Sequence, residues 1–449
     1  MIRVSPRLVA VAAGTLLVAA FSFLPSLAQA PSSNTVALTG ARVIDGTGGP
    51  AIEKGTVVIS KGLIEAAGPE ASVKIPAGAT RIDVSGKTII PGLIDSHAHL
   101  NVEQGSTMPV RDDLVRRLRM YALYGITSTV SLGATQADEM EGLKLRDEQS
   151  GEQANGTLDR ARLYTGALNA VGKTPEEARK SVDRLADLKA DIIKYHINGT
   201  PNDMTPDIYG AIVDEAHRRF LRTAVHVFYL KDAQGALDKG SDVLAHSVRD
   251  QDVPPAFVAE MKRKNIGYIP TLTRDLSVFV YETTPAFFKD AFFQRGISLY
   301  RDHVNQLSDP AHQEKVRNDK SAQAIKPALE QANRNLKILS DGGVPIAMGT
   351  DSGAAGAANL GRWQGYFEHI EMEMMVRAGM TPMQVIVAAT GGGAKVMRVD
   401  ANIGTLQPGH YADLVVLNAN PLTDIRNTQK IDSVWMAGHK LTMSAMKTN

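Results

Sequence analysis

The sequence predicts an α/β protein: a (β/α)8 barrel of the TIM type, with a small β-sandwich domain formed by the N- and C-terminal segments. The middle of the chain alternates short apolar runs with amphipathic helical stretches, and both ends are rich in short β-branched runs. A chain of 449 residues, 43% of them hydrophobic, can bury one large core and one smaller one.

The β-rich ends are expected to form one small domain. Their β-branched runs, punctuated by glycine, lie at 36–38, 41–44, 55–60, 63–67, 412–417 and 433–437. This pattern is typical of a small antiparallel sheet. We therefore expect residues 31–86 and 400–449 to form the β-sandwich domain, with the rest of the chain inserted between its halves.

Residues 87–399 are expected to form the barrel. Eight strand candidates lie at 88–95, 127–132, 161–166, 191–195, 223–227, 242–245, 267–271 and 345–349. Amphipathic stretches such as 174–188, 206–220 and 255–265 separate them. Strands that alternate with helices form parallel sheets, and eight such strands close a TIM-type barrel.

One interval departs from this alternation. Between Thr273 and Asp341 the chain is mostly helix-forming and rich in charged residues. We expect a helical insertion at about residues 275–340, lying over the mouth of the barrel as a lid or serving as an oligomer contact. A homo-oligomer therefore stays an open alternative.

The first thirty residues have the pattern of an export signal. Arg3 and Arg7 precede a largely apolar stretch at 8–24, and Pro25 comes before the small-x-small sequence that ends at Ala30. We expect a signal peptide at 1–30 and a secreted or periplasmic mature protein. The alternative is a membrane anchor, but the apolar stretch is short for a span. No stable membrane insertion is expected after signal removal.

Charge and cysteine content exclude several classes of function. Lys and Arg number 49 against 48 Asp and Glu, so the charge offers no field to attract nucleic acid, and a small-molecule substrate is expected. The chain has no cysteine, which excludes disulfides, a Cys-rich zinc site and a thiol nucleophile. Any metal ion must be held by histidine, carboxylate or an equivalent group.

Residues able to bind metal lie at the ends of several predicted strands. His97 and His99 end the first strand, and residues two apart in an extended chain point to the same side. The carboxyl ends of barrel strands form one ring, where active sites are assembled. The other candidates on this ring are Lys194 in strand four, His226 and His246 at the ends of strands five and six, and Asp351 after strand eight.

With these motifs the chain resembles the amidohydrolase superfamily, from about residue 38 to residue 440. The resemblance also rests on the flanking sequences at 404–409 and 412–417. Within the superfamily the chain is most similar to the imidazolonepropionase-like branch, which includes prolidase-type dipeptidases and an ochratoxin-hydrolysing amidase.

The resemblance implies a site with two divalent metal ions. Lys194 would be N6-carboxylated and would bridge them, because a free ammonium has no lone pair to offer a cation. His97, His99 and Asp351 would hold the more buried ion. His226 and His246 would hold the more exposed one. A ligand set without sulfur suits zinc, although manganese or cobalt could substitute.

The chemistry implied is hydrolysis of an amide or peptide bond in a small substrate of the dipeptide or N-acyl amino acid type. A metal-bridging hydroxide would attack the carbonyl, and Asp351 would transfer the proton to the leaving nitrogen. A lactonase or esterase using the same centre stays open as an alternative. A deaminase is disfavoured because no acid follows His226 closely. A secreted binding protein without catalysis is disfavoured by the complete ligand set.

Five residues near the strand ends are candidates for substrate binding. A Tyr or His could donate to a developing oxyanion, and an Arg could bind a substrate carboxylate. The candidates are Tyr195, His196, Tyr229, Arg249 and Arg274. A further pair, His369 and Glu373, shares one face of a predicted helix, where packing is the favoured role.

Overall fold

The computed structural model describes residues 35–102, 106–134, 136–353 and 360–442. The predicted signal peptide at 1–30 lies outside the described residues. Within them the chain forms one eight-stranded sheet and two four-stranded parallel sheets.

The eight-stranded sheet combines both ends of the chain. Its strands are β1 (Thr35–Val43), β2 (Ile52–Ser60), β3 (Leu63–Pro69), β4 (Thr80–Asp83), β5 (Thr88–Pro91), β14 (Leu414–Leu417), β15 (Ile431–Met436) and β16 (His439–Lys440). The two ends meet where β5 pairs antiparallel with β14. Alternate apolar residues such as Leu38, Val57 and Trp435 form a core on this sheet. The ends therefore pair as expected, but their strands belong to a single sheet rather than to two sheets of a sandwich.

The predicted first barrel strand, 88–95, is two strands. β5 ends at Pro91, and β6 (Leu93–His99) begins after Gly92 in a different sheet. A Cβ atom at Gly92 would overlap the side chain of Thr127, so the chain crosses here at a distance that only glycine permits. This crossing carries the chain from the eight-stranded sheet to the strand that bears His97 and His99.

The remaining strands form two parallel sheets. The first has the order β13 (Ser352–Gly353), β6, β7 (Ile126–Ser131) and β8 (Arg162–Thr165). The second has the order β12 (Gly267–Ile269), β11 (Val243–Ala245), β10 (Thr223–His226) and β9 (Ile193–His196). Seven of the eight predicted strand positions thus contain parallel strands. The predicted eighth strand, 345–349, makes only a single bridge, between Ile346 and Tyr268.

Single bridges and hydrogen bonds connect the two parallel sheets. Asn169 bridges to Lys194 on one side. On the other side, the Ser96 amide donates to the Met348 carbonyl at 2.9 Å. The sheets are therefore neighbours at both edges, although the strands are assigned as two sheets and not as one continuous closed barrel.

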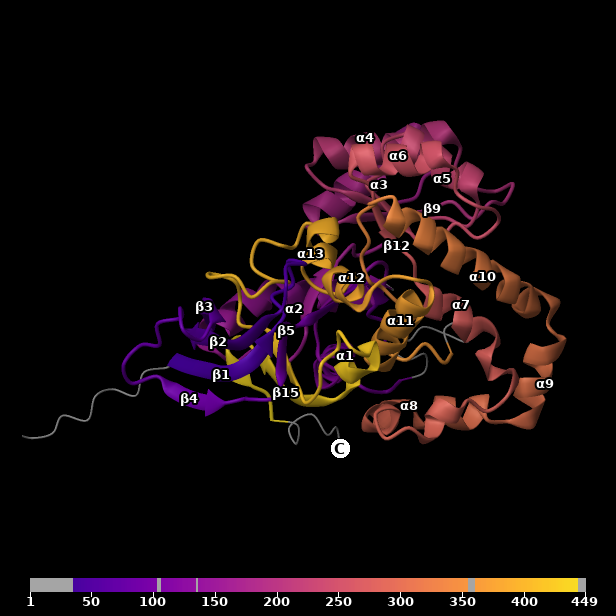
Figure 1. Cartoon of the computed structure of the whole chain (residues 1–449). Coiled ribbons are helices and arrows are strands. Elements are labelled where there is room, and N and C mark those ends of the chain that lie inside the picture. Colours follow the sequence, from indigo (N-terminus) through magenta and orange to yellow (C-terminus); the bar gives the residue numbers. More distant parts are fainter. Residues whose placement is uncertain (1–34, 103–105, 135, 354–359, 443–449) are drawn as a thin grey trace, which may run out of the picture.

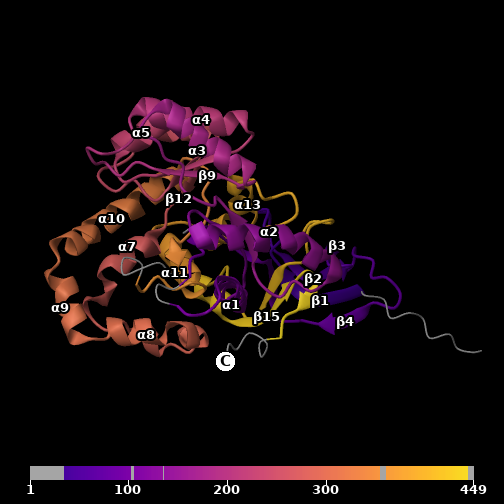
Figure 2. The same cartoon turned by 180° about the vertical axis from the view of Figure 1, so that it is seen from behind.

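Helices alternate with these strands, as the sequence predicts. They are α1 (Val110–Leu123), α2 (Gln136–Asn155), α3 (Pro175–Asp187), α4 (Pro206–Arg218), α5 (Leu230–Asp238), α6 (Pro255–Lys264), α11 (Tyr366–Arg377), α12 (Pro382–Ala388) and α13 (Gly391–Met397). Local sequence sets where several begin: Thr174 caps α3 by accepting from the Glu177 amide, and Pro175 follows it at the first position. Figures 1 and 2 show α3–α6 grouped on the side of β9 and β12.

The interval predicted as a helical insertion contains mainly helices. They are α7 (Leu272–Phe279), η1 (Val280–Glu282), η2 (Ala286–Lys289), η3 (Phe293–Gly296), α8 (Ile297–Leu307), α9 (Pro310–Asn318) and α10 (Lys320–Asp341). Contacts join α7 to both α9 and α10. In Figures 1 and 2, α8–α10 lie on the side of the molecule opposite β1–β4.

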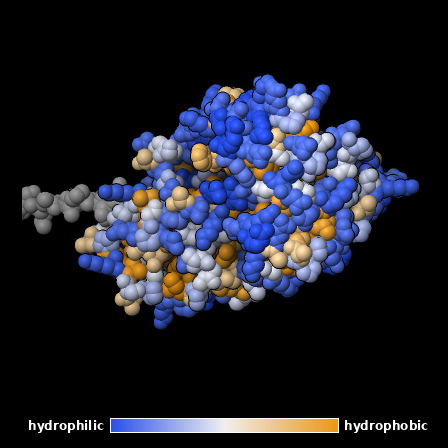
Figure 3. Space-filling model, turned by 90° about the horizontal axis from the view of Figure 1, so that it is seen from above, coloured by the Kyte–Doolittle hydropathy of each residue, from blue (hydrophilic) through white to orange (hydrophobic). Residues whose placement is uncertain are grey.

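The face drawn in Figure 3 is mainly hydrophilic, with apolar residues in small groups. Among the described residues, each helix is too short or too polar to cross a bilayer.

Candidate metal centre

The strand ends bring the six predicted ligands to one region. His97 and His99 lie in the last three residues of β6, Lys194 in β9 and His226 at the end of β10. His246 follows β11 directly, and Asp351 directly precedes β13. Strand β6 pairs with β13, and β10 pairs with both β9 and β11. The parallel register therefore places the carboxyl ends of these strands together.

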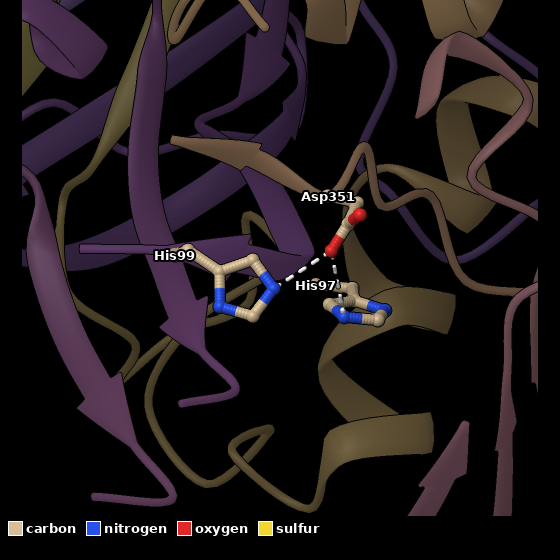
Figure 4. A group of neighbouring side chains, drawn as sticks. All are labelled: His97, His99 and Asp351. Atoms are coloured by element: carbon tan, nitrogen blue, oxygen red, sulfur yellow. Dashed lines mark hydrogen bonds and ion pairs between the residues drawn. The ribbon is translucent and has the colours of Figure 1, made fainter. Parts of the chain in front are cut away.

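His97, His99 and Asp351 form the tightest group. His99 Nε2 lies 2.7 Å and His97 Nε2 lies 3.3 Å from Asp351 Oδ1. Their ligand atoms all lie within 4.8 Å of one another. Figure 4 shows both imidazoles directed at the Asp351 carboxylate. Two nitrogens and one oxygen thus face a common point, as a divalent cation requires.

A second contact sets the tautomer of His99. Its Nδ1 lies 3.1 Å from the Gly133 carbonyl oxygen, which can only accept a hydrogen bond. Nδ1 therefore carries the proton, and in the neutral ring Nε2 presents a lone pair to Asp351 Oδ1. Two lone pairs at 2.7 Å repel each other unless a cation or a proton lies near both.

The other predicted ligands continue from this group. Lys194 Nζ lies 3.4 Å from His97 Nε2. The ring centroid of His246 is 4.5 Å from that of His97 and 4.4 Å from that of His226. His246 Nδ1 contacts Thr271 Oγ1 at 2.7 Å, which leaves Nε2 for a ligand. The six side chains therefore form one continuous cluster.

Burial favours the unprotonated forms of His97, His226, His246 and Lys194. Burial, reinforced by the charge of Lys194, lowers the pKa of His97 and of His226 well below its usual value. Burial and the neighbouring His226 lower the pKa of His246 in the same way. Burial also lowers the pKa of Lys194 to about 7, although Asp351 opposes the shift. Neutral imidazoles have the free lone pairs that metal binding needs.

The donor set fits a divalent metal ion. Burial alone would raise the pKa of Asp351, but the Arg362 guanidinium and the two histidines hold it well below its usual range, so the carboxylate is anionic. His97 Nδ1 is buried and has no hydrogen-bond partner among the described residues. Neutral imidazoles around a carboxylate, without sulfur, are the ligands that zinc accepts.

A buried network holds the two ligand-bearing segments together. Asp95 accepts hydrogen bonds from the amides of His97 and Thr350, at 3.0 and 3.2 Å. Thr350 Oγ1 donates to the other oxygen of Asp95 at 2.6 Å. Burial raises the pKa of Asp95 and, together with the charge of Asp95, that of its neighbour Glu368. The network fixes the position of Asp351 relative to His97.

Backbone conformation is unusual at the same strand ends. His246, Thr271 and Asp351 have positive φ angles of 81°, 49° and 59°. Residues with side chains adopt this region rarely, and such residues concentrate at functional sites. The strain here turns the side chains of His246 and Asp351 towards the cluster.

The structure argues against a substrate contact for two of the five predicted substrate-binding residues. Tyr195 is fully buried, with its hydroxyl on Ser241 and its ring stacked on Tyr209 of α4. Alternation along β9 sends Lys194 and His196 to one side and Tyr195 to the other. Tyr195 therefore packs between strand and helix, away from the cluster.

Arg249 is the second of these two residues. Its guanidinium is buried, pairs with Asp275 at 2.5 Å and donates to the Val227 carbonyl at 3.1 Å. It also lies over the Phe228 ring, 4.6 Å from the centroid. A guanidinium already satisfied in the interior cannot bind a substrate carboxylate without leaving Asp275 uncompensated.

The other three predicted substrate residues lie near the cluster. His196 stacks on His226 with ring centroids 4.9 Å apart, and its buried Nε2 has no partner among the described residues. Tyr229 is 36% exposed at the start of α5. Arg274 Nε lies 3.9 Å from Asp351 Oδ2, and Arg274 also pairs with Asp275. These three could contact a substrate.

Sequence reasoning did not find Arg362, which donates to Asp351 Oδ2 at 2.6 Å. It also missed Asp275, the shared partner of Arg249 and Arg274. In the sequence, Asp275 follows Arg274 and Arg362 follows Asp351. These positions along the chain do not specify which side chains make contact. Glu371 of α11 accepts from the amides of Leu272 and Thr273 at the start of α7.

His369 packs, as the sequence favoured. Its Nδ1 contacts Thr428 Oγ1 at 2.9 Å, and its Nε2 contacts the Tyr124 carbonyl at 2.8 Å. Glu373 on the same helix accepts from Gln429 at 2.8 Å. Both residues therefore join α11 to neighbouring segments.

Comparisons with known proteins agree with this geometry. The sequence model of the Amidohydrolase family matches residues 88–441. Imidazolonepropionase of Streptomyces coelicolor is 25% identical over 359 residues, which cover 78% of this chain and 82% of that protein. Ochratoxinase of Aspergillus niger is 27% identical over 278 residues, or 59% of this chain and 48% of that protein.

Solved structures share the fold. A Xaa-Pro dipeptidase with bound methionine has a TM-score of 0.69 at 19% identity, covering 90% of this chain and 99% of that one. The A. niger ochratoxinase structure has a TM-score of 0.68 at 21% identity, covering 91% of this chain and 96% of that one. The parallel-stranded part thus has a TIM-barrel-like α/β fold.

Proposed function

The chain belongs to the amidohydrolase family, and from this premise we propose that it is a binuclear metal-dependent hydrolase that cleaves an amide or peptide bond in a small substrate. The substrates proposed are dipeptides or N-acyl amino acids. The observation that carries the proposal is the meeting of six metal-competent side chains from different strands in one buried cluster.

Each of the six side chains has a proposed role. His97, His99 and Asp351 hold one divalent ion, and His226 and His246 hold the second, with zinc as the proposed metal. When bound, such ions activate water for attack near neutral pH and polarise a substrate carbonyl. The lowered pKa values of His97, His226 and His246, and that of Asp351, favour the unprotonated forms that metal binding needs.

Lys194 is proposed to be N6-carboxylated. Its neutral amine attacks carbon dioxide, a nitrogen–carbon bond forms, and one proton is released, which leaves a carbamate anion. The support is positional: the side chain is only 1% exposed and lies 3.4 Å from His97, so a bridging anion formed there would reach both halves of the cluster.

Asp351 is the proposed proton carrier. Its carboxylate accepts a proton from the attacking water and returns it to the leaving nitrogen. Arg362 holds Oδ2 at 2.6 Å, so Oδ1 stays directed at the imidazoles. His196, with an unpartnered Nε2 beside His226, is placed to donate to the substrate carbonyl oxygen.

The architecture and the location of the protein are part of the proposal. The bridges at Asn169–Lys194 and Ile346–Tyr268 support the view that the two parallel sheets act as one barrel. We also propose that the mature chain begins after Ala30 and works outside the cytoplasm. N-terminal sequencing of exported protein tests this directly, and an intact residue 1–30 segment would contradict it.

Metal analysis of the wild type and of Lys194→Ala tests the function. The wild type should hold about two ions per chain, and the variant should lose at least one of them together with most of its activity. Short carboxylic acids should restore part of both, because a carboxylate can take the place of the carbamate. The control is Lys180→Ala on α3, an exposed lysine that pairs with Glu176.

The substrate panel should contain dipeptides, N-acyl amino acids, esters and lactones. Hydrolysis of the amides supports the proposal, and activity on the esters or lactones alone would replace it with an esterase or lactonase. Protein purified without chelator that holds no metal and hydrolyses nothing would contradict the enzyme proposal.

A further inference from the structure

A cavity that is open to solvent lies beside the candidate metal centre. It has a volume of about 390 Å³ and lies between α7, α8, α9 and α10. Its polar wall includes Arg274, His312 and Lys315, and its apolar wall includes Val278, Val316 and Ile325. This volume falls within the range of small-molecule pockets, about 300 to 1,000 Å³.

The cavity adjoins the cluster on the side of Asp351. Arg274 lines the cavity, and its Nε lies 3.9 Å from Asp351 Oδ2. Leu360 also lines it, two residues before Arg362, which binds the same oxygen. Arg274 is therefore the residue that the cluster and the cavity have in common.

The cavity wall carries charged groups of both signs. Lys315 makes no ion pair within the part of the chain that the structure describes, and His312 lies one helical turn before it on the same face of α9. Asp319 also lines the cavity, but its carboxylate caps α10 by accepting from the amides of Ser321 and Ala322. Among the described residues, Lys315 is therefore the cation of this wall that has no ion-pair partner, and it lies next to aliphatic surface.

We propose that this cavity is the specificity pocket of the enzyme and that Lys315, together with Arg274, recognises a carboxylate on the substrate. The substrate class is an N-acyl amino acid or dipeptide with a free carboxylate and an aliphatic side chain. The carboxylate pairs with Lys315 and Arg274, and the aliphatic group packs on Val278, Val316 and Ile325.

The inference rests on the proposed function, because it assumes that the bond cleaved lies at the cluster. The carboxylate-binding role predicted for Arg249, which is buried and paired with Asp275, is assigned instead to Lys315 of α9. The two residues are 66 positions apart in the sequence. Helix α9 has no buried residue of its own, so core packing does not explain why Lys315 lines the cavity.

The test compares N-acetyl-L-leucine with its neutral amide, N-acetyl-L-leucinamide, by acetate release from the metal-loaded enzyme. The wild type should prefer the acid by at least about tenfold in kcat/KM, and Lys315→Met should lose most of that preference through KM. The matched control is Lys320→Met, an exposed lysine at the start of α10 that does not line the cavity. Its preference should equal that of the wild type.

Calorimetric binding to the protein as purified gives a readout that does not depend on turnover. N-acetyl-L-leucine should bind the wild type and Lys320→Met more tightly than the amide does, and Lys315→Met should bind both alike. Acetate release without a preference for the acid would overturn the pocket and leave the hydrolase standing. Binding of the acid without acetate release would contradict the hydrolase proposal and leave the pocket standing. Binding that Lys315→Met does not change, or no binding by the wild type, would overturn the pocket.

Discussion

Arg362 controls the orientation of Asp351. It donates to Oδ2, the oxygen that His99 does not contact, and its side chain is only 11% exposed. A ligand carboxylate with one oxygen held by a partner can turn only its other oxygen to a metal. Such partners tune both ligand position and ligand basicity.

Replacing Arg362 should weaken the metal centre without unfolding the protein. Arg362→Ala should lower kcat/KM by about 10- to 100-fold, because Asp351 loses its positional partner. Guanidinium chloride at millimolar concentration should restore part of this activity, since the cation can occupy the vacated position. Arg301→Ala on the exposed face of α8 is the control. Full activity of Arg362→Ala would contradict the positioning role.

His369 shows a histidine used for packing. Burial lowers its pKa from 6.5 to about 4, while its hydrogen bond to Tyr124 opposes the shift. Between these two values the unfolded chain binds a proton that the folded chain excludes. The free energy of unfolding therefore falls as the pH falls through this window, by up to about 3 kcal/mol.

The variant His369→Gln should flatten this dependence. Between pH 7 and pH 5 the wild type should lose about 2 kcal/mol more of its unfolding free energy than the variant does. Urea unfolding at several pH values measures the difference. His439→Gln, at an exposed position in β16, should follow the wild type. Parallel pH profiles of wild type and His369→Gln would show that His369 does not titrate in this range.

At the scale of elements, Gly92 governs how β5 connects to β6. A Cβ atom there would lie within 2.6 Å of Thr127 Cβ in the neighbouring strand β7. The strand that carries His97 and His99 therefore approaches β7 only because position 92 has no side chain. The position of this pair of ligands depends on that approach.

Gly92→Ala should destabilise the protein by about 3 kcal/mol, because the added methyl group would overlap the side chain of Thr127. Adding Thr127→Ala should recover part of the loss. Gly151→Ala in α2 is the control, since open space surrounds that position and alanine favours a helix by up to about 1 kcal/mol. Thermal unfolding of the three variants measures the effects, and a neutral Gly92→Ala would contradict the close approach.

Strand β9 illustrates what an element alone determines. Lys194 and His196 lie on the face of the cluster, while Tyr195 lies between β9 and α4. Strict alternation predicts this separation from the sequence. The prediction that Tyr195 binds substrate used nearness along the chain and ignored this two-residue period, and the observed position of Tyr195 argues against it.

At the scale of the whole molecule, one buried ion pair joins the eight-stranded sheet to the parallel strands. Arg162 of β8 pairs with Asp413 at 2.5 Å, just before β14. Asp413 also accepts from the Ala437 amide at 2.8 Å. The two ends of the chain and the barrel-like part are therefore tied together by a carboxylate that local sequence does not explain.

Asp413→Ala should cost about 3 kcal/mol, because it leaves the Arg162 guanidinium buried without its counter-ion. Replacing both partners by Arg162→Met and Asp413→Leu should cost less. Glu53→Ala removes an exposed pair with Arg42 and should change stability by less than about 1 kcal/mol. Chemical denaturation measures all three, and equal effects of Asp413→Ala and Glu53→Ala would contradict the linking role.

Much of the parallel-stranded part followed from local patterns. Apolar runs of strand length between amphipathic helices predicted seven of the positions where parallel strands occur. The division of 88–95 into two strands did not follow, because both halves are equally apolar and only their partners differ. The sequence also did not predict that the strands at the chain ends form a single sheet. The reason is the same, because the choice of partner among similar strands depends on the tertiary structure.

The sequence by itself determined which groups arrive together: His97, His99, Lys194, His226, His246 and Asp351 each lie at or near a strand end, and parallel strands end at one edge. Only the tertiary structure decided which charged groups around them are free. Arg249 and Arg362 pair with Asp275 and Asp351, whereas Lys315 of an inserted helix reaches a cavity beside the cluster. The physical reason is that an ion pair or a burial depends on neighbours from distant segments, whereas strand alternation depends only on the next residues.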